Sequence, residues 1–278
     1  MSKPMVIKVG GRPTRVRVDG HPDMRPILLL HGIGRSLEDW TPQYQRLGVC
    51  RIIALDLPGF GFSARPSPSM SLRAIADAVW ETLDVIGEKR PLHVVGNSVG
   101  GTVGLQLLTL QPRRVSSLTL VNSAGFGSEA NWMLRLLATP ILGSLSARHP
   151  TRAAVRMLER AIFADPSLAT ATRIEHALRI ARERPDAGAA LHELARELGT
   201  ARGFRLRWRA DLITQASMYR VPTLIVWGER DKILPAAHLS AAGRLLPHAK
   251  THLFSGIGHM PQIECPDEFA ELLLGFIE

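Results

Sequence analysis

Ser98 is the residue in this 278-residue chain whose surroundings most clearly predict chemistry. It is the centre of a Gly-x-Ser-x-Gly pattern, between Gly96 and Gly100, with a short apolar strand predicted before it at residues 92–95 and an apolar helix after it at residues 99–110. A serine held on a sharp strand-to-helix turn has strained backbone angles, and the residues two places before and after it crowd together. Glycine at both places therefore predicts a nucleophilic serine at the turn.

A neutral hydroxyl is a weak nucleophile, so Ser98 needs a base, and the base needs a carboxylate to orient it. His259 lies in a loop that follows a predicted short strand at residues 251–254. Asp231 lies in the turn after a predicted buried strand at residues 223–228. We expect His259 to be the base and Asp231 the acid. Other carboxylates compete for the role of the acid: Glu229, Asp56 and Asp211.

The same chemistry needs two fixed N–H donors aimed at the oxygen of a tetrahedral intermediate, which together form an oxyanion hole. A predicted strand at residues 27–30 runs into a loop that contains Gly32 and Gly34, whose backbone can approach a ligand closely. We expect one donor to be the N–H of Ile33 in this loop. The other is the N–H of Val99, directly after the nucleophile.

In these motifs the chain resembles the α/β-hydrolase superfamily, specifically its lid-bearing serine hydrolases. The motifs that carry the resemblance are His31-Gly32, residues 56–63, residues 96–101, residues 228–231 and Gly258-His259. The family's chain order of nucleophile, acid and base is also that of Ser98, Asp231 and His259. The resemblance implies that Asp231 is the acid and that His31 organises its loop without transferring protons.

Strands alternate with helices along most of the chain, which predicts a mostly parallel sheet covered on both faces. The predicted strands lie at residues 5–9, 14–18, 27–30, 51–55, 92–95, 117–121, 223–228 and 251–254, with helices near 41–47 and at 71–87. With the resemblance, we expect an eight-stranded α/β-hydrolase fold. Its core comprises residues 1–125 and 213–278, and residues 126–212 form a helical lid inserted after strand six.

The predicted lid contains helical segments and no convincing strand. Its run at residues 132–138 is apolar around most of its circumference, which suits either packing within the lid or the lining of a pocket. We expect an apolar acyl pocket between lid and sheet, with most lid arginines facing solvent. Its candidate lining residues are Gly32, Asn97, Trp132, Leu134, Leu137 and Met260.

Composition limits the other classes of function. The net charge of +9 comes mostly from dispersed arginine without a nucleic-acid motif, so we interpret it as solvated surface charge and expect no nucleic-acid partner. No apolar run reaches the about 18 residues of a membrane span, and residues 1–10 lack a signal-peptide core. Cys50 and Cys265 lie in unlike contexts, which favours a cytoplasmic protein. The histidines lack ligand spacing, so we expect no metal, and the chemistry needs no cofactor.

We therefore predict a serine hydrolase that cleaves a small or medium apolar carboxylic ester. The first alternative is a carbon–carbon bond hydrolase of meta-cleavage dienoates, although Met260 stands where those enzymes usually have tryptophan after the histidine. A cofactor-free perhydrolase or haloperoxidase could use the same three residues. A ligand receptor of this fold is an alternative from another class. Nothing in the sequence indicates an oligomeric state.

Overall fold

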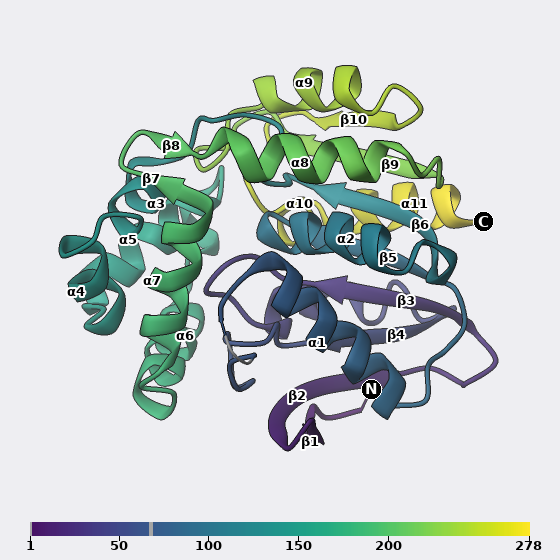
Figure 1. Ribbon diagram of the computed structural model, residues 1–278, viewed down its shortest axis with the longest axis horizontal. Helices are drawn as coiled ribbons and strands as arrows, with labels where there is room; N and C mark the ends of the chain where they lie inside the picture. The colour runs from purple at the N-terminus through teal and green to yellow at the C-terminus, as the bar shows by residue number, and fades with distance from the viewer. Residues whose placement is uncertain (1, 67–68) are drawn as a thin grey trace.

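The computed structural model describes residues 2–66 and 69–278, in which eight strands form one sheet in the order β1-β2-β4-β3-β5-β6-β9-β10 (Figure 1). The strands are β1 (Met5–Val9), β2 (Arg12–Asp19), β3 (Arg25–Leu30), β4 (Cys50–Leu55), β5 (Leu92–Asn97), β6 (Val115–Val121), β9 (Thr223–Gly228) and β10 (Lys250–Phe254). β2 is antiparallel to both β1 and β4, and the other pairs are parallel. The predicted eight-stranded, mostly parallel sheet is confirmed.

Helices cover both faces of this sheet. The helices of the chain are α1 (Leu72–Val85), α2 (Val99–Leu110), α3 (Trp132–Leu137), α4 (Leu142–Arg148), α5 (Arg152–Ile162), α6 (Ala171–Glu183), α7 (Ala187–Leu198), α8 (Leu206–Ser217), α9 (Ala237–Leu245), α10 (Pro261–Glu264) and α11 (Pro266–Ile277). Short 3₁₀ helices are η1 (Leu37–Gln43), η2 (Pro112–Arg114) and η3 (Pro166–Leu168). Helices α1, α2 and α8 pack together on one face, whereas η1 and α11 lie on the other (Figure 1).

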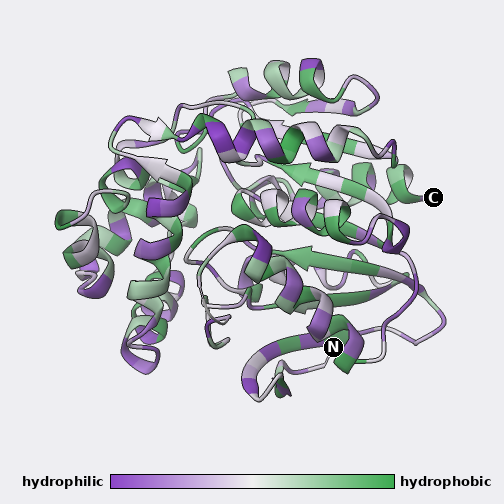
Figure 2. Ribbon diagram, in the orientation of Figure 1, coloured by the Kyte–Doolittle hydropathy of each residue, from purple (hydrophilic) through white to green (hydrophobic). Residues whose placement is uncertain are grey.

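The alternation of side chains along each central strand builds one apolar core on each face of the sheet. In β3, Leu28 and Leu30 join the core under α1 and α2, while Ile27 and Leu29 join the core under η1 and α11. All four are fully buried. Because both faces are covered, the central strands are almost continuously hydrophobic (Figure 2). This double burial holds the carboxyl ends of the strands in fixed positions.

Two local features differ from the sequence prediction. The predicted helix near residues 41–47 is a 3₁₀ helix that ends at Gln43, with Pro42, which has no N–H to donate, inside it. The segment between β6 and β9 was expected to lack strands, but it contains a small hairpin of β7 (Gly199–Thr200) and β8 (Gly203–Phe204). Strands of two residues are too short to show a hydrophobic period.

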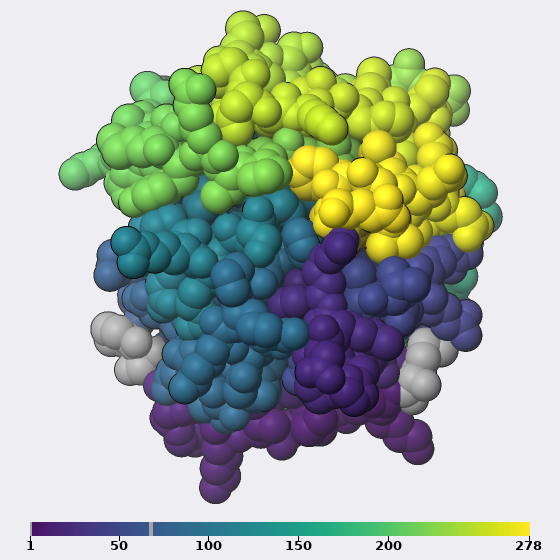
Figure 3. Space-filling view, turned by 90° about the vertical axis from the view of Figure 1, so that its right-hand side faces the viewer, coloured from purple at the N-terminus to yellow at the C-terminus, as the bar shows by residue number. Residues whose placement is uncertain are grey.

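The segment between β6 and β9 contributes α3 to α7 and the β7–β8 hairpin, which lie beyond the carboxyl ends of the parallel strands (Figure 1). At the opposite end of the molecule the C-terminal residues, in yellow, lie beside purple residues from the N-terminal part of the chain (Figure 3). The Arg25 guanidinium donates there to the carbonyl of Ile277 at 2.5 Å. Within the described ranges no helix has the length and apolarity needed to cross a membrane. In parallel sheets ligands bind at the carboxyl ends of the strands, so the helical segment faces the expected site.

Candidate active site

Ser98 occupies a strained turn between β5 and α2. Its φ of 55° and ψ of −121° lie outside the regions that L-residues usually adopt, at a cost of about 1–3 kcal/mol. Backbone hydrogen bonds offset this strain: the N–H of Ser98 donates to the carbonyl of Val121 at 2.9 Å, and the carbonyl of Ser98 accepts from the N–H of Ala124 at 3.2 Å. The neighbouring strand thus fixes the turn that presents the hydroxyl.

Gly96 and Gly100 are required by contact distances around this turn. A Cβ atom on Gly96 would overlap the backbone of Gly100, and one on Gly100 would overlap the carbonyl of Leu30 in β3. The sequence argument from crowding therefore corresponds to real backbone contacts, both within the turn and with the next strand. Substitution of either glycine would displace Ser98.

Asp231 and His259 form a buried pair at the ends of β9 and β10. The Nδ1 atom of His259 lies 2.7 Å from Oδ2 of Asp231, and the Asp231 side chain is fully shielded from solvent. The other carboxylate oxygen accepts from the N–H groups of Ile233 and Leu234, at 2.7 and 3.0 Å. This carboxylate is held from both sides, so the Nδ1 atom of His259 carries the proton that it donates to Asp231.

Asn122 is a contact of this pair whose role the sequence analysis did not predict. Its Nδ2 group donates to Oδ2 of Asp231 at 2.7 Å, and also lies 3.3 Å from the carbonyl of Gly258. Asn122 is fully buried at the end of β6 and has a φ of 45°. The only signal in the sequence was an asparagine, a residue that tolerates the left-handed region, directly after a strand.

Several backbone groups fix the loop that carries His259. The N–H of His259 donates to the carbonyl of Ile162 in α5 at 2.8 Å, and the carbonyl of His259 accepts from the amide of Asn97 at 3.0 Å. The carboxylate of Glu264 accepts from the N–H groups of Gly258 and Ala164, at 3.0 and 2.7 Å. Burial raises the pKa of Glu264 despite these donors. The helical segment between β6 and β9 thus contacts this loop directly.

The predicted oxyanion loop lies against Ser98. A Cβ on Gly32 would be 3.3 Å from the Cβ of Ser98, which places the loop in van der Waals contact with the predicted nucleophile. In the part of the chain that the structure describes, the N–H groups of Ile33 and Val99 have no intramolecular hydrogen-bond partner. Both are therefore free to donate to a ligand.

His31 holds this loop in place. Its Nε2 atom accepts from the N–H of Leu57 at 2.8 Å, and its Nδ1 atom lies 2.7 Å from the carbonyl of Gly32. Complete burial lowers the pKa of His31, which keeps the ring neutral with the proton on Nδ1. Both ring nitrogens are used, as expected for a residue that organises its loop.

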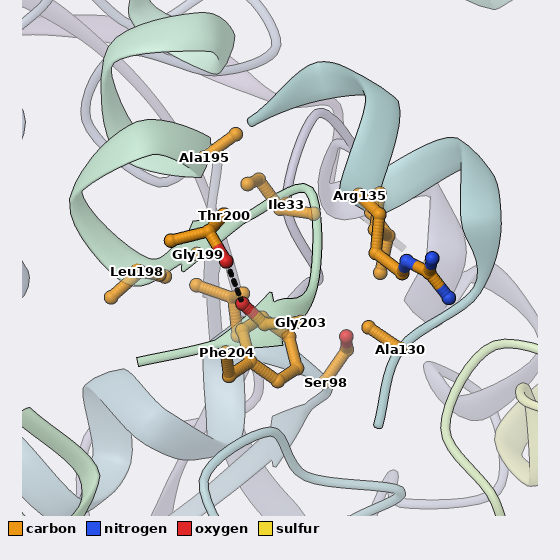
Figure 4. Close-up of a pocket in the computed structure, with 12 residues that line it drawn as sticks. Ile33, Ser98, Ala130, Arg135, Ala195, Leu198, Gly199, Thr200, Gly203 and Phe204 are labelled. Carbon is orange, nitrogen blue, oxygen red and sulfur yellow. Dashed lines mark hydrogen bonds between the residues drawn. The ribbon is translucent and has the colours of Figure 1, made fainter. Parts of the chain in front are cut away.

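Two cavities meet at Ser98. The larger, of about 90 Å³, is lined by both Ser98 and His259 together with mostly apolar side chains. It includes five of the predicted pocket residues: Gly32, Asn97, Leu134, Leu137 and Met260. The smaller, of about 20 Å³, lies between Ser98 and the β7–β8 hairpin (Figure 4). Trp132 lines neither of these cavities and is 54% exposed, because it is on the outer side of α3.

The rival acids lie away from His259. Glu229 is exposed, and its carboxylate accepts from the Ser255 hydroxyl and the Gly256 N–H at 2.9 and 2.8 Å. Asp56 accepts from the N–H groups of Leu37 and Phe62, both at 2.8 Å. Asp211 is exposed on α8. Among the carboxylates expected as candidates, Asp231 is the one in contact with His259.

A buried cluster of four charges joins the oxyanion loop to the helical segment. Arg35, two residues after Ile33, makes two hydrogen bonds of 2.8 Å to Asp39 in η1 and also contacts Glu159 in α5. Arg173 of α6 donates to both of these acids at 2.9 Å. The arginines were expected to be solvated surface charges, but these two are largely buried. Pairing with Asp39 and Glu159 makes their burial possible.

The arginines shift the titration of the acids in this cluster. Burial alone would raise the pKa of Asp39 and Glu159, but Arg35 and Arg173 hold both pKa values below the usual range. In the unfolded chain these carboxyls titrate near pH ~4. The unfolded state therefore binds more protons as the pH falls through ~4, and the native state does so only at lower pH. The stability from the cluster is fully present above pH ~4 and is lost below it.

We expect Asp39→Asn to lower the free energy of unfolding at pH 7 by about 3 kcal/mol, because it leaves two buried guanidinium groups with one acid. The variant should also lose less stability than the native chain between pH 4 and 2.5. Urea unfolding at several pH values measures both effects. Asp77→Asn in the exposed pair with Arg73 is the matched control and should change little. An unchanged pH slope in Asp39→Asn would contradict the cluster's role.

The described residues contain no group of three or more His, Cys, Asp or Glu side chains placed to hold a metal ion. The polar groups around Ser98 are instead arranged as a hydroxyl, an imidazole paired to a carboxylate, and two free N–H donors. This arrangement is suited to nucleophilic attack on a carbonyl and stabilisation of the resulting oxyanion.

A family described as the alpha/beta hydrolase fold matches residues 25–266. The chain belongs to this family. A relative from Pseudomonas putida, named the dihydrolipoyllysine-residue acetyltransferase component of an acetoin cleaving system, is 32% identical over 275 residues, which are 99% of this chain and 69% of the relative. Lipase 1 of Psychrobacter immobilis is 28% identical over 253 residues, 88% of this chain and 74% of the lipase.

Solved structures agree with this assignment to the α/β-hydrolase fold. The meta-cleavage product hydrolase from Pseudomonas fluorescens IP01 superposes with a TM-score of 0.79 at 26% identity, and the match covers 98% of this chain and 96% of that enzyme. The resemblance inferred from the sequence motifs is thus confirmed. Family and relatives together support a hydrolase as the broad class of activity.

Proposed function

We propose that this chain is a serine hydrolase that cleaves carboxylic esters through an acyl-enzyme on Ser98. The observation that carries the proposal is the placement of the strained Ser98 turn and the buried Asp231–His259 pair at one cavity. The P. immobilis relative is named a lipase, which denotes hydrolysis of an ester, and the P. putida relative is named an acetyltransferase component, which denotes transfer of an acetyl group.

In the proposed reaction His259 accepts the proton of Ser98 on Nε2 as Oγ forms a bond to the carbonyl carbon. Asp231 stabilises the imidazolium and keeps the Nδ1 proton in place. The N–H groups of Ile33 and Val99 donate to the oxyanion. His259 then gives its proton to the alkoxide oxygen as the C–O bond breaks, and the alcohol leaves. Water, deprotonated by His259, then attacks the acyl carbon, and His259 returns this proton to Ser98 Oγ as the acyl C–Oγ bond breaks and the acid leaves.

Helices α3 to α7 and the β7–β8 hairpin act as a lid in this proposal, within residues 126–212 inserted between core segments 1–125 and 213–278. The first residues of α8, from Leu206, also fall in this range, although α8 packs against α2. Contacts of α5 support this role, because Glu159 reaches the oxyanion loop through Arg35 and the Ile162 carbonyl accepts from the His259 N–H. The lid thus completes the walls of the cavity and restrains the loop that carries the base.

A fluorophosphonate probe tests the nucleophile. We expect stoichiometric labelling at Ser98, found in a peptide that contains residues 96–101, because the probe reacts with an activated serine beside an oxyanion hole. The Ser98→Ala variant should remain unlabelled. Labelling of that variant to the same extent would show that another serine reacts and would overturn the assignment.

An activity panel separates the alternatives that share these residues. We expect steady multiple turnover of p-nitrophenyl acetate, which a ligand receptor would not show. Faster turnover of a 2-hydroxy-6-oxo-dienoate than of every ester would favour carbon–carbon bond hydrolysis of meta-cleavage dienoates, and the P. fluorescens neighbour is named a meta-cleavage product hydrolase. Preferential formation of a peracid from acetate and hydrogen peroxide would favour a perhydrolase.

Asn122 provides a test of the acid's surroundings. We expect Asn122→Gly to lower kcat about 10-fold to 100-fold with little change in KM, because a hydrogen bond to the Asp231 carboxylate is lost. Glycine is the suitable replacement, since it tolerates the φ of 45° at this position. Steady-state kinetics with p-nitrophenyl acetate measure the effect. A variant with native kcat would show that Asn122 does not position Asp231.

A further inference from the structure

The two cavities at Ser98 differ in which catalytic groups line them. Ser98, Ile33 and Leu134 line both. His259 lines only the larger cavity of about 90 Å³, and Val99 lines only the smaller one of about 20 Å³. Ser98 therefore stands between a side that contains the base and a side that contains Val99, while Ile33 borders both.

Because of this asymmetry, the acyl group and the alcohol group of an ester would bind on different sides of Ser98. The inference rests on the proposed function, in which His259 delivers its proton to the leaving alkoxide oxygen as the C–O bond breaks. That oxygen must therefore lie within hydrogen-bond reach of His259, on the side of the larger cavity. The acyl carbon is bonded to Ser98 Oγ, the oxyanion and the leaving oxygen, so its remaining substituent points away from the leaving oxygen and from His259, towards the side on which the small cavity lies. The acyl chain thus enters the smaller cavity.

We propose that the chain is selective for acetate esters, with the acetyl methyl group in the small cavity and an apolar alcohol group in the large one. The small cavity, at about 20 Å³, has less than a quarter of the space of the large one, at about 90 Å³, so it suits the smaller substituent of the ester, here the acetyl methyl group. The larger cavity has room for several carbon atoms, and its walls include Leu158, Leu191 and Ile233. The small cavity then sharply limits the length of the acyl chain, whereas the large cavity accepts alcohol groups of several lengths.

The wall of the small cavity is fixed by contacts outside it, which makes the limit on acyl length rigid. Phe204 packs edge-on against Trp208, with ring centroids 6.0 Å apart, and its N–H donates to the carbonyl of Ser128 at 2.9 Å. The indole N–H of Trp208 donates to the carbonyl of Leu198, another lining residue, at 2.6 Å. Figure 4 shows the hairpin residues arranged around this space beside Ser98.

Arg135 borders the same cavity, and its Nε–H donates to the carbonyl of Ala201 in the hairpin turn at 2.8 Å. This bond ties α3 to the hairpin across the cavity. The assignment also changes the role of Leu137, expected from the sequence in an acyl pocket, because it lines only the larger cavity. Leu137 would contact the alcohol group.

Two series of esters test, in the unmodified protein, which cavity binds the acyl group and which binds the alcohol group. With p-nitrophenol as the constant leaving group, we expect kcat/KM to fall about tenfold or more from acetate to butyrate, because the longer chain overfills the small cavity. With acetyl as the constant acyl group, kcat/KM should rise from ethyl to hexyl acetate. A butyrate that is cleaved as fast as the acetate would overturn the proposal.

Variants on the two sides form a matched pair. Phe204→Ala widens the small cavity and should raise the butyrate-to-acetate ratio of kcat/KM about tenfold. Leu158→Ala widens only the large cavity, so it should leave this ratio unchanged while altering the alcohol series. Ala130→Val narrows the small cavity and should lower the propionate-to-acetate ratio, which tests the site if Phe204→Ala does not fold. A shift of the acyl ratio by Leu158→Ala alone would reverse the assignment of the cavities.

Labelling of Ser98 and turnover of esters together distinguish a wrong acyl-site assignment from a wrong proposed function. If Ser98 is labelled by fluorophosphonate and esters are turned over without a preference for acetate, the acyl-site assignment is wrong and the serine hydrolase remains. If Ser98 is not labelled and no ester is turned over, the proposed function itself is wrong.

Discussion

Replacing Ser98 with alanine is expected to lower kcat for p-nitrophenyl acetate by about four to six orders of magnitude while leaving KM nearly unchanged. The variant loses the atom that attacks the carbonyl carbon. The walls of both cavities and the free N–H donors of Ile33 and Val99 remain, so substrate binding persists. The residual rate comes from water held near His259 and from stabilisation of the oxyanion.

Ser123 is the matched control for this substitution. It lies in the same region, at the end of the neighbouring strand, but it is fully buried and its hydroxyl donates to the carbonyl of Ala124 at 3.1 Å. We expect Ser123→Ala to keep its rate within a few-fold of the native rate. Single-turnover measurements ensure that chemistry is observed. A Ser98→Ala enzyme that retained more than about 1% of native kcat would contradict the acyl-enzyme mechanism.

The arrangement around Ser98 could be predicted where the cause is local. Gly96 and Gly100 are neighbours of the turn in sequence, and their need for close backbone contact follows from sterics alone. The parallel sheet was predictable for a related reason, since doubly buried strands have recognisable apolar runs. The prediction that Asp231 contacts His259 rested on motif order and on the expectation that strand ends meet at one edge of the sheet.

Features that depend on tertiary packing were not predictable. Arg35 and Glu159 lie far apart in the chain, and each alone has the character of a surface charge, so their burial together had no sequence signal. The β7–β8 hairpin is too short to give a period, yet it forms one wall at Ser98. Trp132 was expected to line the pocket, but its side chain is exposed. The sequence of a helix that is apolar all round does not reveal which side faces a cavity.

Asp231→Asn is expected to lower kcat/KM about 10⁴-fold while the protein stays folded. The N–H groups of Ile233 and Leu234 would bind the amide oxygen, at the place of the carboxylate oxygen that they bind now. The amide NH₂ would then face His259 Nδ1, which could accept from it only by moving its proton to Nε2. An Nε2 that carries the proton cannot take one from Ser98. The same NH₂ would also face the Nδ2 donor of Asn122.

Glu229→Gln is the matched control, because it makes the same change from acid to amide two residues away. The Glu229 carboxylate is exposed and contacts Ser255 and Gly256, not the histidine ring. We expect its kcat/KM to stay within a few-fold of native, since an amide oxygen can still accept these two bonds. Kinetics with p-nitrophenyl acetate, together with near-UV circular dichroism and Tm, separate loss of chemistry from loss of fold. A larger loss in Glu229→Gln than in Asp231→Asn would identify Glu229 as the orienting acid, which would require the loop after β10 to rearrange before catalysis.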